Sequence, residues 1–466
     1  MKKLFLYLFY QAVKLLVKLI FRIFYAKTVI TNKQGLYNDH PGVVVSNHPN
    51  ALIDPLQVAS RTSKMQHFLA NINMFEHPIG NWFFGTFYCI PIERPKDVEG
   101  KGKEAQKKRA AQNRKSFARC NAFLASGGSL YIAPQGGMEL ERRVTKFKTG
   151  TARIVMSAES ANDFSLGLYI LPIGLNYIAA NEFRSNLLIN VGQPLRVDQY
   201  REMYQEDVFQ TVRQMTADLE TQVRALTIHT LDDKEDAFLH HLETIETTDA
   251  PLGMEAHFHR TQQVLQELRH AQKNVSQVYQ QLQATTFQYF EQLRKNKSSD
   301  AAFVASQDPK GVGQMGLKML GMLIGFPLFL YGWLNNFLAC YLPSWIAQKM
   351  KLFEGYKSTV KMISSIFVFP IIYGLQVYLI YRWGGNAWWS LIYFLSLYPL
   401  GLLAWWYRDR WQYLRQAFAA AKMGKSTPGE FNQLIEQRKS IQALMAQIRL
   451  EYKRVQPASS VTHPKP

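Results

Sequence analysis

Cysteine is scarce in this sequence of 466 residues, and so are the short cysteine spacings that metal sites and disulfide frameworks need. The three cysteines, Cys89, Cys120 and Cys340, lie far apart along the chain. Small disulfide-rich domains and zinc sites carry cysteines at short, repeated intervals. The sequence therefore indicates neither a disulfide framework nor a metal site, and the low cysteine content fits a reducing compartment.

Acidic residues are also few, with 35 Asp and Glu against 54 Lys and Arg, for a formal net charge of +19. Such a balance favours an anionic partner, namely nucleic acid, an anionic membrane surface or a phosphorylated substrate. No nucleic-acid-binding module is recognisable. We therefore expect anionic membrane lipids or a phosphorylated substrate as partners, and no nucleic acid.

Charge is nearly missing from three long apolar segments, Leu317 to Cys340, Ile363 to Tyr381 and Ala387 to Trp406. Each is close to the roughly 20 residues that a helix needs to cross the hydrocarbon core of a bilayer. Tryptophans crowd their ends, as interfacial aromatic residues do. Three buried helices of a soluble domain are the alternative, but the uniform apolarity favours about three transmembrane helices within residues 317–406.

The N-terminus, residues 1–27, predicts a different membrane element. At about 100° per residue, its polar and aromatic side chains fall on one stripe of a helix whose remaining surface is apolar. The stripe contains Lys3, Tyr7, Tyr10, Gln11, Lys14, Lys18, Arg22 and Tyr25. This pattern favours an amphipathic helix at a membrane interface, and a tilted span with snorkelling lysines is the alternative.

Residues 35–200 have the pattern of an α/β domain, a mixed sheet flanked by helices. Short apolar runs typical of strands alternate with helical stretches at 102–125 and 151–160. The expected strands are Gly42–Val45, Phe87–Ile92, Ser129–Ala133, Leu168–Leu175 and Leu187–Val191. Pro172 predicts an edge or irregular position for the fourth of these strands.

The rest of the chain predicts helices without chemistry of their own. Residues 201–313 form a helical connector and linker, in which apolar residues from Leu265 to Leu293 recur as on the packed face of one long helix. Residues 407–466 begin as a basic helical tail and end in a stretch rich in Ser and Pro that predicts disorder.

One turn carries the clearest chemical signal. The run Val43-Val44-Val45 leads into a turn with His48 and, shortly after it, Asp54. An imidazole is suited to accept a proton near neutral pH, and a carboxylate can fix its tautomer and stabilise its charged form. Two alternatives are structural: a histidine that only shapes the turn, and Asp54 as a helix N-cap before Pro55.

Three further motifs in the α/β domain carry charge or glycine at the ends of strands. Arg94 could fork onto a phosphate, although a surface arginine is the common alternative. Gln135-Gly136-Gly137 forms a turn whose backbone N–H groups could approach an oxyanion. Lys148 lies near the start of a helix.

In order and spacing, these motifs resemble the four blocks of the PlsC-type phospholipid/glycerol acyltransferases, over roughly residues 35–200. The segment Phe183-Arg184-Ser185 is similar to the one that follows the fourth block in glycerol-3-phosphate and dihydroxyacetone-phosphate acyltransferases. The resemblance implies His48 as general base and Asp54 as its orienting partner. It implies substrate-binding roles for Asn47, Arg94, Gln135, Gly136, Gly137, Lys148 and Arg184.

The implied reaction moves a fatty acyl group from acyl-CoA or acyl-carrier protein to the free hydroxyl of 1-acyl-glycerol-3-phosphate (lysophosphatidic acid), in phospholipid biosynthesis. Glycerol-3-phosphate or dihydroxyacetone phosphate is the alternative acceptor. An activated thioester needs no cofactor or metal. Two departures from the family pattern, five residues instead of four between His48 and Asp54 and glutamine in place of glutamate at Gln135, keep open a catalytically weak, lipid-binding adaptor with the same fold.

The expected location is the bacterial inner membrane with the catalytic domain on the cytoplasmic face. Lysines lie between the first two apolar segments, and arginines follow the third. Three full crossings would put these cations on the side opposite the residues before the first segment, against the positive-inside rule. Either a re-entrant segment or a crossing N-terminal helix would remove this conflict.

Overall fold

The computed structural model describes residues 2–37, 39–76, 78–86, 88–94, 97, 100, 102–384 and 386–455. The chain divides into two compact units. Unit 1 comprises residues 1–231 and 347–362, and unit 2 comprises residues 232–346 and 363–466. Phe87 and the expected disordered end of the tail, residues 456–466, lie outside the described residues.

Unit 1 is built around an eight-stranded mixed sheet in the order β1-β7-β6-β2-β5-β3-β4, with β8 also paired to β6. The run β6-β2-β5-β3-β4 is parallel, β7 is antiparallel to β6, and β1 is parallel to β7. The strands are β1 (Lys27–Thr31), β2 (Gly42–Ser46), β3 (Gln66–Asn71), β4 (Cys89–Ile92), β5 (Ser129–Ile132), β6 (Tyr169–Tyr177), β7 (Asn186–Val191) and β8 (Leu195–Arg196).

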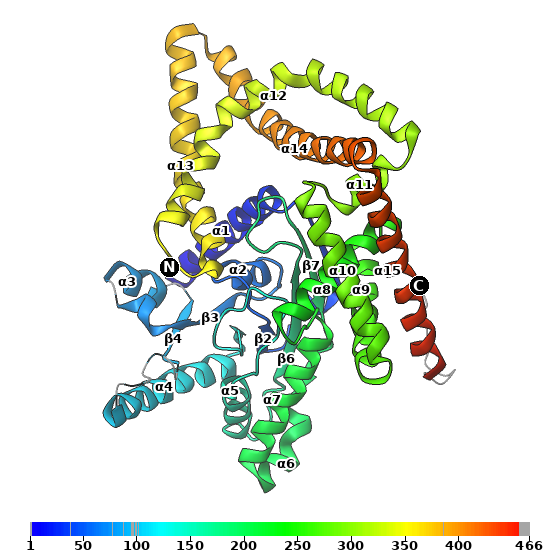
Figure 1. Ribbon diagram of the computed structural model, residues 1–466. Coiled ribbons are helices and arrows are strands. Elements are labelled where there is room, and N and C mark those ends of the chain that lie inside the picture. Colours follow the sequence, from blue (N-terminus) through cyan, green and yellow to red (C-terminus); the bar gives the residue numbers. More distant parts are fainter. Residues whose placement is uncertain are drawn as a thin grey trace. The chain divides into compact units, whose positions relative to one another are not determined.

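Helices cover both faces of this sheet (Figure 1). The helices of unit 1 are α1 (Lys2–Phe24), α2 (Ile53–Ala59), α3 (Pro78–Thr86), α4 (Gly102–Ala125), α5 (Gly150–Ser160), α6 (Arg201–Glu206) and α7 (Val208–Ala225). Single 3-10 turns are η1 (Lys33–Leu36), η2 (Ile72–Phe75) and η4 (Asp198–Tyr200). The mixed sheet with flanking helices is the expected fold class.

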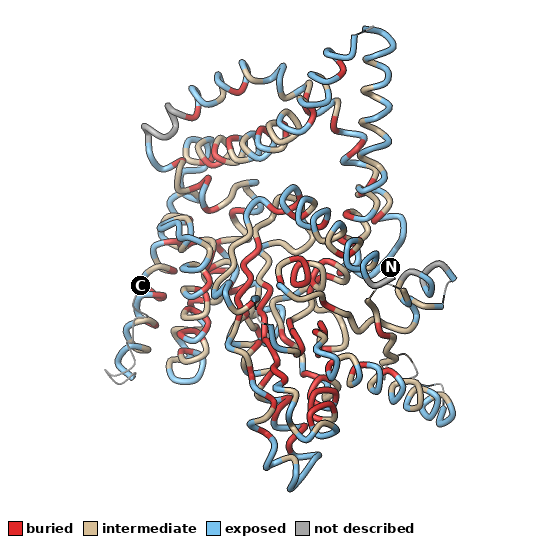
Figure 2. Tube along the Cα trace, turned by 180° about the vertical axis from the view of Figure 1, so that it is seen from behind, coloured by how far each residue is buried: buried red, intermediate tan, exposed pale blue. Residues whose placement is uncertain are grey.

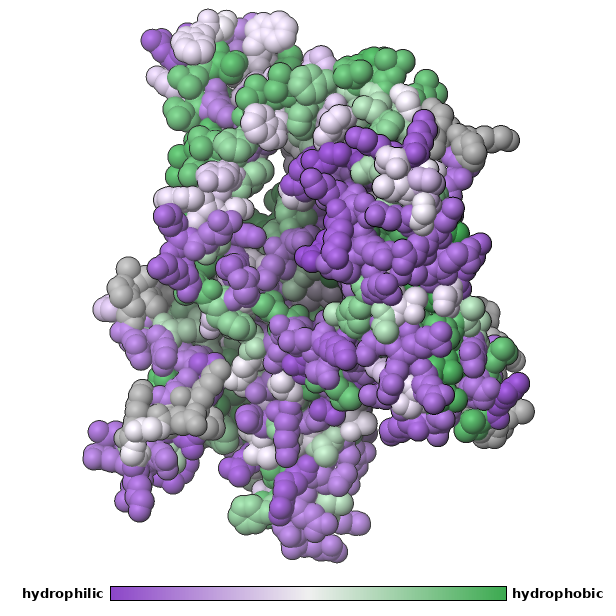
Figure 3. All heavy atoms as spheres, viewed as in Figure 1, coloured by the Kyte–Doolittle hydropathy of each residue, from purple (hydrophilic) through white to green (hydrophobic). Residues whose placement is uncertain are grey.

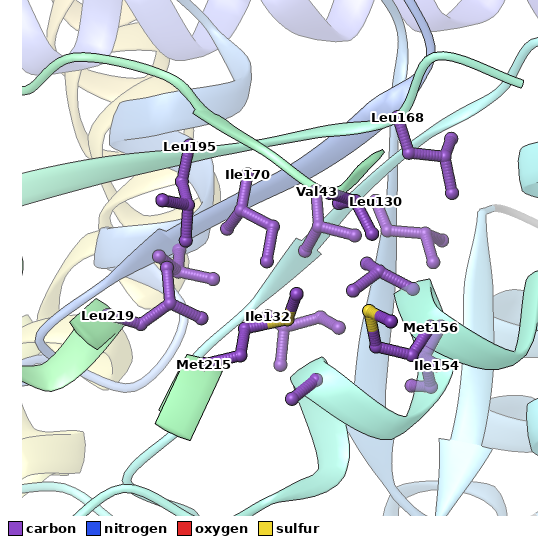
Figure 4. Close-up of a cluster of buried hydrophobic side chains, with 14 of the residues drawn as sticks. Val43, Leu130, Ile132, Ile154, Met156, Leu168, Ile170, Leu195, Met215 and Leu219 are labelled. Atoms are coloured by element: carbon purple, nitrogen blue, oxygen red, sulfur yellow. The ribbon is translucent and has the colours of Figure 1, made fainter. Parts of the chain in front are cut away.

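The two-residue periodicity of a strand sends neighbouring side chains of β2 into two different cores. Val43 and Val45 are buried with residues of α4, α5 and α7 on one face, as Figure 4 shows for Val43, Leu130 and Met215. Val44 is buried on the other face with residues of α1 and α2. Figure 2 shows the resulting band of buried residues along the strands. The continuous apolar run at 43–45 follows from this burial on both faces.

All five expected strands are present, and of the two positions expected for the strand with Pro172, edge or irregular, the second is observed. β6 is an inner strand between β2 and β7, not an edge strand. Pro172 is nevertheless in an irregular position, because β6 pairs with β8 at Tyr169 and Ile170 and with β7 only from Ile173 onward. The proline lies where the partner strand changes, so its missing N–H breaks no continuous ladder.

Helix α1 packs along unit 1 through the side of the helix that carries part of the predicted polar stripe. The Tyr10 hydroxyl accepts a hydrogen bond from the Gln66 backbone N–H at 3.1 Å, and Lys14 Nζ donates to the Thr62 carbonyl at 2.6 Å. Phe21 is buried in the core beneath the sheet. Leucines such as Leu15, 70% exposed, cover the outer side. The exposed face is therefore mainly apolar.

Unit 2 is helical. Its helices are α8 (Asp233–Asp249), α9 (Met254–Asn274), α10 (Ser276–Lys295), α11 (Asp300–Ser306), α12 (Pro309–Lys349), α13 (Glu354–Gly384), α14 (Ala387–Ser426) and α15 (Pro428–Val455), with the junction of α12 and α13 belonging to unit 1. The expected single long helix over residues 265–293 was wrong, because the chain breaks at Val275 between α9 and α10.

Four described helices are long and apolar enough to cross a membrane: α1 over Leu4–Phe24, α12 over Met315–Lys349, α13 and α14. Large apolar side chains on α12, α13 and α14 are exposed, for example Ile324 at 75%. Figure 3 shows apolar residues gathered over this part of unit 2, in contrast to the polar surface elsewhere in the same view. These helices associate the protein with a membrane.

Candidate active site

The candidate residues follow the carboxyl ends of the parallel strands. His48 follows β2, Arg94 follows β4, and Gln135 follows β5. Because these strands are parallel, their carboxyl ends meet at one edge of the sheet, which is where ligands bind in open α/β sheets. β2 lies between β5 and β6, whereas β4 is three strands away from β2, about 14 Å at about 4.8 Å per strand.

The structure brings His48 and Asp54 together. His48 Nδ1 lies 3.0 Å from Asp54 Oδ2, and the two side chains are 17% and 0% exposed. His48 precedes α2, whereas Asp54 lies in its first turn, so the five-residue interval is bridged by the turn and not by a helical face. With Nδ1 on the carboxylate, Nε2 is the nitrogen available to a substrate.

Asp54 is fully buried and holds several donors. Its Oδ2 also accepts from the Asn50 backbone N–H at 2.6 Å, and its Oδ1 accepts from the Tyr177 hydroxyl at 2.7 Å. Burial raises the pKa of the Asp54 carboxyl, while the hydrogen bonds from His48, Tyr177 and Asn50 oppose the rise. Asp54 is not the N-cap, since that position is Leu52.

Gln135 supports the backbone of the histidine. Its Oε1 accepts from the His48 backbone N–H at 2.9 Å, and its Nε2 donates to Thr145 Oγ1 at 3.0 Å. The His48 carbonyl in turn accepts from the Glu139 N–H at 3.1 Å. The side-chain carbonyl of this buried glutamine therefore holds the His48 backbone, and its NH₂ group is held by Thr145. A negative charge at position 135 is not required for these two contacts.

Asn47 joins the end of β2 to β6. Its Oδ1 accepts from the Leu175 N–H at 2.7 Å, and its Nδ2 donates to the Leu175 carbonyl at 2.9 Å. Asn47 thus serves as a side-chain extension of the β2–β6 pairing next to His48. Its substrate-binding role stays a prediction.

Arg94 forms a bidentate ion pair with the Asp97 carboxylate. Its Nε lies 3.1 Å from Asp97 Oδ2, and one terminal nitrogen lies 2.9 Å from Asp97 Oδ1. Burial alone would raise the pKa of the Asp97 carboxyl, but the hydrogen bonds and charge of Arg94 outweigh it, so this pKa is lowered. The guanidinium therefore has the bidentate geometry that a phosphate would need, with Asp97 as its partner. Binding of a phosphate here would require exchange of that partner or use of the remaining donors.

The other predicted substrate-binding residues border the same edge. Gly136 has a φ of +69°, a left-handed conformation that favours glycine, and Gly137 continues the turn. Lys148 is exposed, and its N–H donates to the Pro134 carbonyl at 2.8 Å. Arg184, with a φ of +64°, lies in the β6–β7 loop, and its N–H donates to the Phe24 carbonyl at 2.7 Å. No side-chain contact joins these residues to His48 in the described part of the chain.

Tyr177 is the residue that sequence reasoning missed. Burial and the charge of Asp54 raise its pKa well above the ordinary tyrosine value, so it stays a phenol that donates to Asp54. A signal was available, because the two-residue period through Leu171, Ile173 and Leu175 places Tyr177 on the sheet face that α2 covers. That period identifies the face of the sheet but not the partner.

The part of the chain that contains these residues is similar to known proteins. Residues 27–176 match the family model Acyltransferase. Glycerol-3-phosphate O-acyltransferase 2 of Saccharomyces cerevisiae is 23% identical over 184 residues, which are 38% of this chain and 25% of that protein. An uncharacterized acyltransferase of Schizosaccharomyces pombe is 30% identical over 82 residues, 17% of this chain and 12% of that protein.

The solved structure of the 1-acyl-sn-glycerophosphate (LPA) acyltransferase PlsC from Thermotoga maritima aligns with 45% of this chain and 80% of its own, at 15% identity and a TM-score of 0.30. The chain spans a quarter or less of the length of the two yeast relatives. The family match extends over β2, β4 and β5, which lead to His48, Arg94 and Gln135. The domain at residues 27–176 is thus similar to the Acyltransferase family.

Proposed function

We propose that this protein transfers a fatty acyl group from acyl-CoA or acyl-carrier protein to a free hydroxyl of a glycerol phosphate, in phospholipid biosynthesis. The observation that supports this most is the contact of His48 Nδ1 with the buried Asp54 carboxylate at 3.0 Å, inside an acyltransferase-family domain. A thioester is already activated, so the reaction needs a base, positioning and stabilisation of charge.

In the proposed reaction, His48 Nε2 accepts the proton of the acceptor hydroxyl as its oxygen attacks the thioester carbonyl. Asp54 stabilises the imidazolium that forms. The tetrahedral intermediate collapses with formation of the ester C–O bond and cleavage of the C–S bond. His48 then returns the proton to the leaving thiolate, so that the enzyme ends unchanged. Lys148, Arg184 and the outer donors of Arg94 are the candidate cations for the acceptor phosphate.

Two acceptors are candidates. The motif order supports 1-acyl-glycerol-3-phosphate, and the match to a protein named glycerol-3-phosphate O-acyltransferase supports glycerol-3-phosphate. The purified protein should be offered each acceptor with labelled acyl-CoA or acyl-carrier protein. A His48→Ala variant should lose product formation, whereas His259→Ala, at an exposed histidine of unit 2, should not. Equal turnover by the two variants would refute His48 as the base, and no product from folded wild type would favour a lipid-binding adaptor.

We also propose that the catalytic unit lies on the cytoplasmic face of a bacterial inner membrane. The cations near the apolar helices and the apolar outer face of α1 support a site held at the level of lipid head groups. Membrane fractionation, followed by protease treatment of inverted vesicles, tests this placement. Unit 1 should be digested only in inverted vesicles.

A further inference from the structure

The segment that joins α12 to α13 belongs to unit 1 and contacts the turn that carries His48. The Ala51 N–H donates to the Gly355 carbonyl at 3.2 Å, and the Leu52 N–H donates to Thr359 Oγ1 at 3.2 Å. Both donors lie in the turn between His48 and Asp54. A stretch about 300 residues further along the chain thus supplies the acceptors for its backbone.

The fit between the two segments is close. A Cβ at Gly355 would lie 3.3 Å from the Pro49 carbonyl oxygen and 3.2 Å from Met138 Sδ. Contacts of that length are tighter than ordinary van der Waals packing, so glycine permits the approach of α13 to the turn. Thr359 is buried, at 7% exposure, so water cannot readily replace its hydroxyl.

A second set of contacts ties the same segment to the β6–β7 loop. Ser358 Oγ donates to Asn181 Oδ1 at 2.6 Å and lies 3.2 Å from the Ala180 carbonyl. Asn50 Nδ2 donates to that same carbonyl at 3.2 Å. The His48 turn, the β6–β7 loop and the start of α13 therefore form one hydrogen-bonded group.

We propose that Thr359 is a positioning residue for the His48–Asp54 pair. Its hydroxyl holds Leu52, which is the N-cap of α2, and Asp54 lies two residues further, in the first turn of that helix. Fixing this turn fixes the distance between the imidazole and the carboxylate. The proposal rests on the function proposed above, with the start of α13 as part of the catalytic unit.

The test compares Thr359→Val, which removes the acceptor at nearly constant volume, with Thr359→Ser, which keeps it. The valine variant should lose about 5- to 10-fold in kcat with KM unchanged, as expected for one hydrogen bond. Serine should restore kcat. Thr221→Val is the matched control, because Thr221 is exposed and its Oγ1 donates within its own helix, to the Ala217 carbonyl at 2.9 Å.

Hydrogen exchange gives a readout that does not need activity. Exchange of the Ala51 and Leu52 amides should be faster in Thr359→Val than in wild type and normal in Thr359→Ser. Unchanged exchange or unchanged kcat in the valine variant would refute the positioning role. Absence of His48-dependent turnover in the wild type would instead refute the proposed function, and the exchange result would then decide separately whether Thr359 holds the turn.

Contacts within unit 2 carry a second, independent inference about α12. Its first half runs antiparallel to α14. The Tyr407 hydroxyl donates to the Met322 carbonyl at 2.9 Å, and Asn336 Nδ2 donates to the Leu397 carbonyl at 3.1 Å. Met322 is therefore level with Tyr407, at the end of the apolar part of α14.

The same part of α12 also meets α13. Gln376 Nε2 donates to the Asn335 carbonyl at 3.0 Å, and the Tyr373 hydroxyl donates to Asn336 Oδ1. Beyond this point α12 continues to the junction with α13, and both ends of that junction, Ala347 and Met362, belong to unit 1. The second half of α12 therefore returns toward the level at which α13 begins.

We infer that α12 is re-entrant and that α13 and α14 are the crossing pair. If α13 and α14 each cross, Met362 and Tyr407 lie on one side of the membrane. Met322 is level with Tyr407, and Ala347 belongs with Met362, so both ends of α12 lie on that side as well. From Met322 to Asn336 the helix advances about 21 Å, less than the roughly 30 Å of the hydrocarbon core.

This arrangement removes the conflict with the positive-inside rule. Lys349 and Lys351 at the α12–α13 junction and Arg408 and Arg410 after α14 then share one side of the membrane with the residues that precede α12 in the sequence. Polar residues within the apolar helices are paired with each other. The Tyr393 hydroxyl donates to Asn335 Oδ1 at 2.6 Å, so the amide has a protein partner where hydrocarbon offers none.

Cysteine labelling tests the inference without any assay of activity. The three native cysteines are replaced by alanine, and single cysteines are introduced as Gln307→Cys, Met350→Cys and Ala387→Cys, all at exposed positions. A membrane-impermeant maleimide should label the first two only in inverted vesicles and the third only in intact cells. Labelling after detergent permeabilisation confirms that each thiol is accessible. Reaction of positions 307 and 350 from opposite sides would refute the re-entrant helix.

Discussion

Replacement of Asp54 by asparagine separates the charge of the carboxylate from its shape. Asp54 Oδ2 accepts from His48 Nδ1 and from the Asn50 N–H, whereas Oδ1 accepts only from the Tyr177 hydroxyl among the described contacts. An asparagine can keep its oxygen toward His48 and Asn50 and turn its NH₂ toward Tyr177, because a hydroxyl can also accept. The fold and the tautomer of His48 should therefore survive.

Asp54→Asn should lower kcat because the neutral amide no longer stabilises the His48 imidazolium that forms during the reaction. Hydrogen bonds to charged groups contribute about 1.5–3 kcal/mol, so losing the charge should lower kcat roughly 10- to 100-fold with little change in KM. Acyl transfer under saturating donor and acceptor measures this effect. Tyr177→Phe is the control, because it removes one donor and keeps the charge, and it should cost less than Asp54→Asn. A folded Asp54→Asn enzyme with the wild-type kcat would refute the orientation and charge roles of Asp54.

Three further predictions follow from the structure. Gln135→Glu should keep near wild-type kcat, because a carboxylate can still accept from the His48 N–H and the Thr145 hydroxyl can donate to it. Gln135→Leu, which loses both contacts, should lower kcat about 10-fold. Wild-type turnover by the leucine variant would contradict this role of Gln135. Burial and the nearby Arg119 lower the pKa of His67 to about 4, whereas an unfolded histidine has a pKa of about 6.5. The unfolded state therefore takes up the proton first, and the free energy of unfolding should fall as the pH falls from about 6.5 to about 4. Thermal unfolding should show a smaller loss over this window in His67→Phe than in wild type. In unit 2, Arg438 lies 2.8 Å from the fully buried Asp300, so Asp300→Ala should lower the free energy of unfolding by about 3 kcal/mol, and a change within 1 kcal/mol, as measured by chemical denaturation, would contradict the buried pair.

The parts of the fold that the sequence predicted are those with a local signal. The run Val43 to Val45 predicts β2, because such a continuous apolar run is typical of a strand buried on both faces. The helical pattern at residues 102–125 predicts both ends of α4. β1 and β3 were not predicted. Their residues are mostly half-buried and mix polar with apolar types, so they obtain their pairing from β7, β4 and β5 and not from their own pattern.

The candidate site divides in the same way. His48 and Asp54 could be predicted, because one short segment contains both side chains and the strand that presents them. The group that holds them comes from Gln135, Tyr177 and Thr359, on three other segments. Each of these forms its contact through an ordinary amide or hydroxyl, and such side chains show no sequence pattern that names a distant partner. The chemistry of this site is thus local in sequence, whereas its geometry depends on tertiary contacts that extend to the start of a membrane helix.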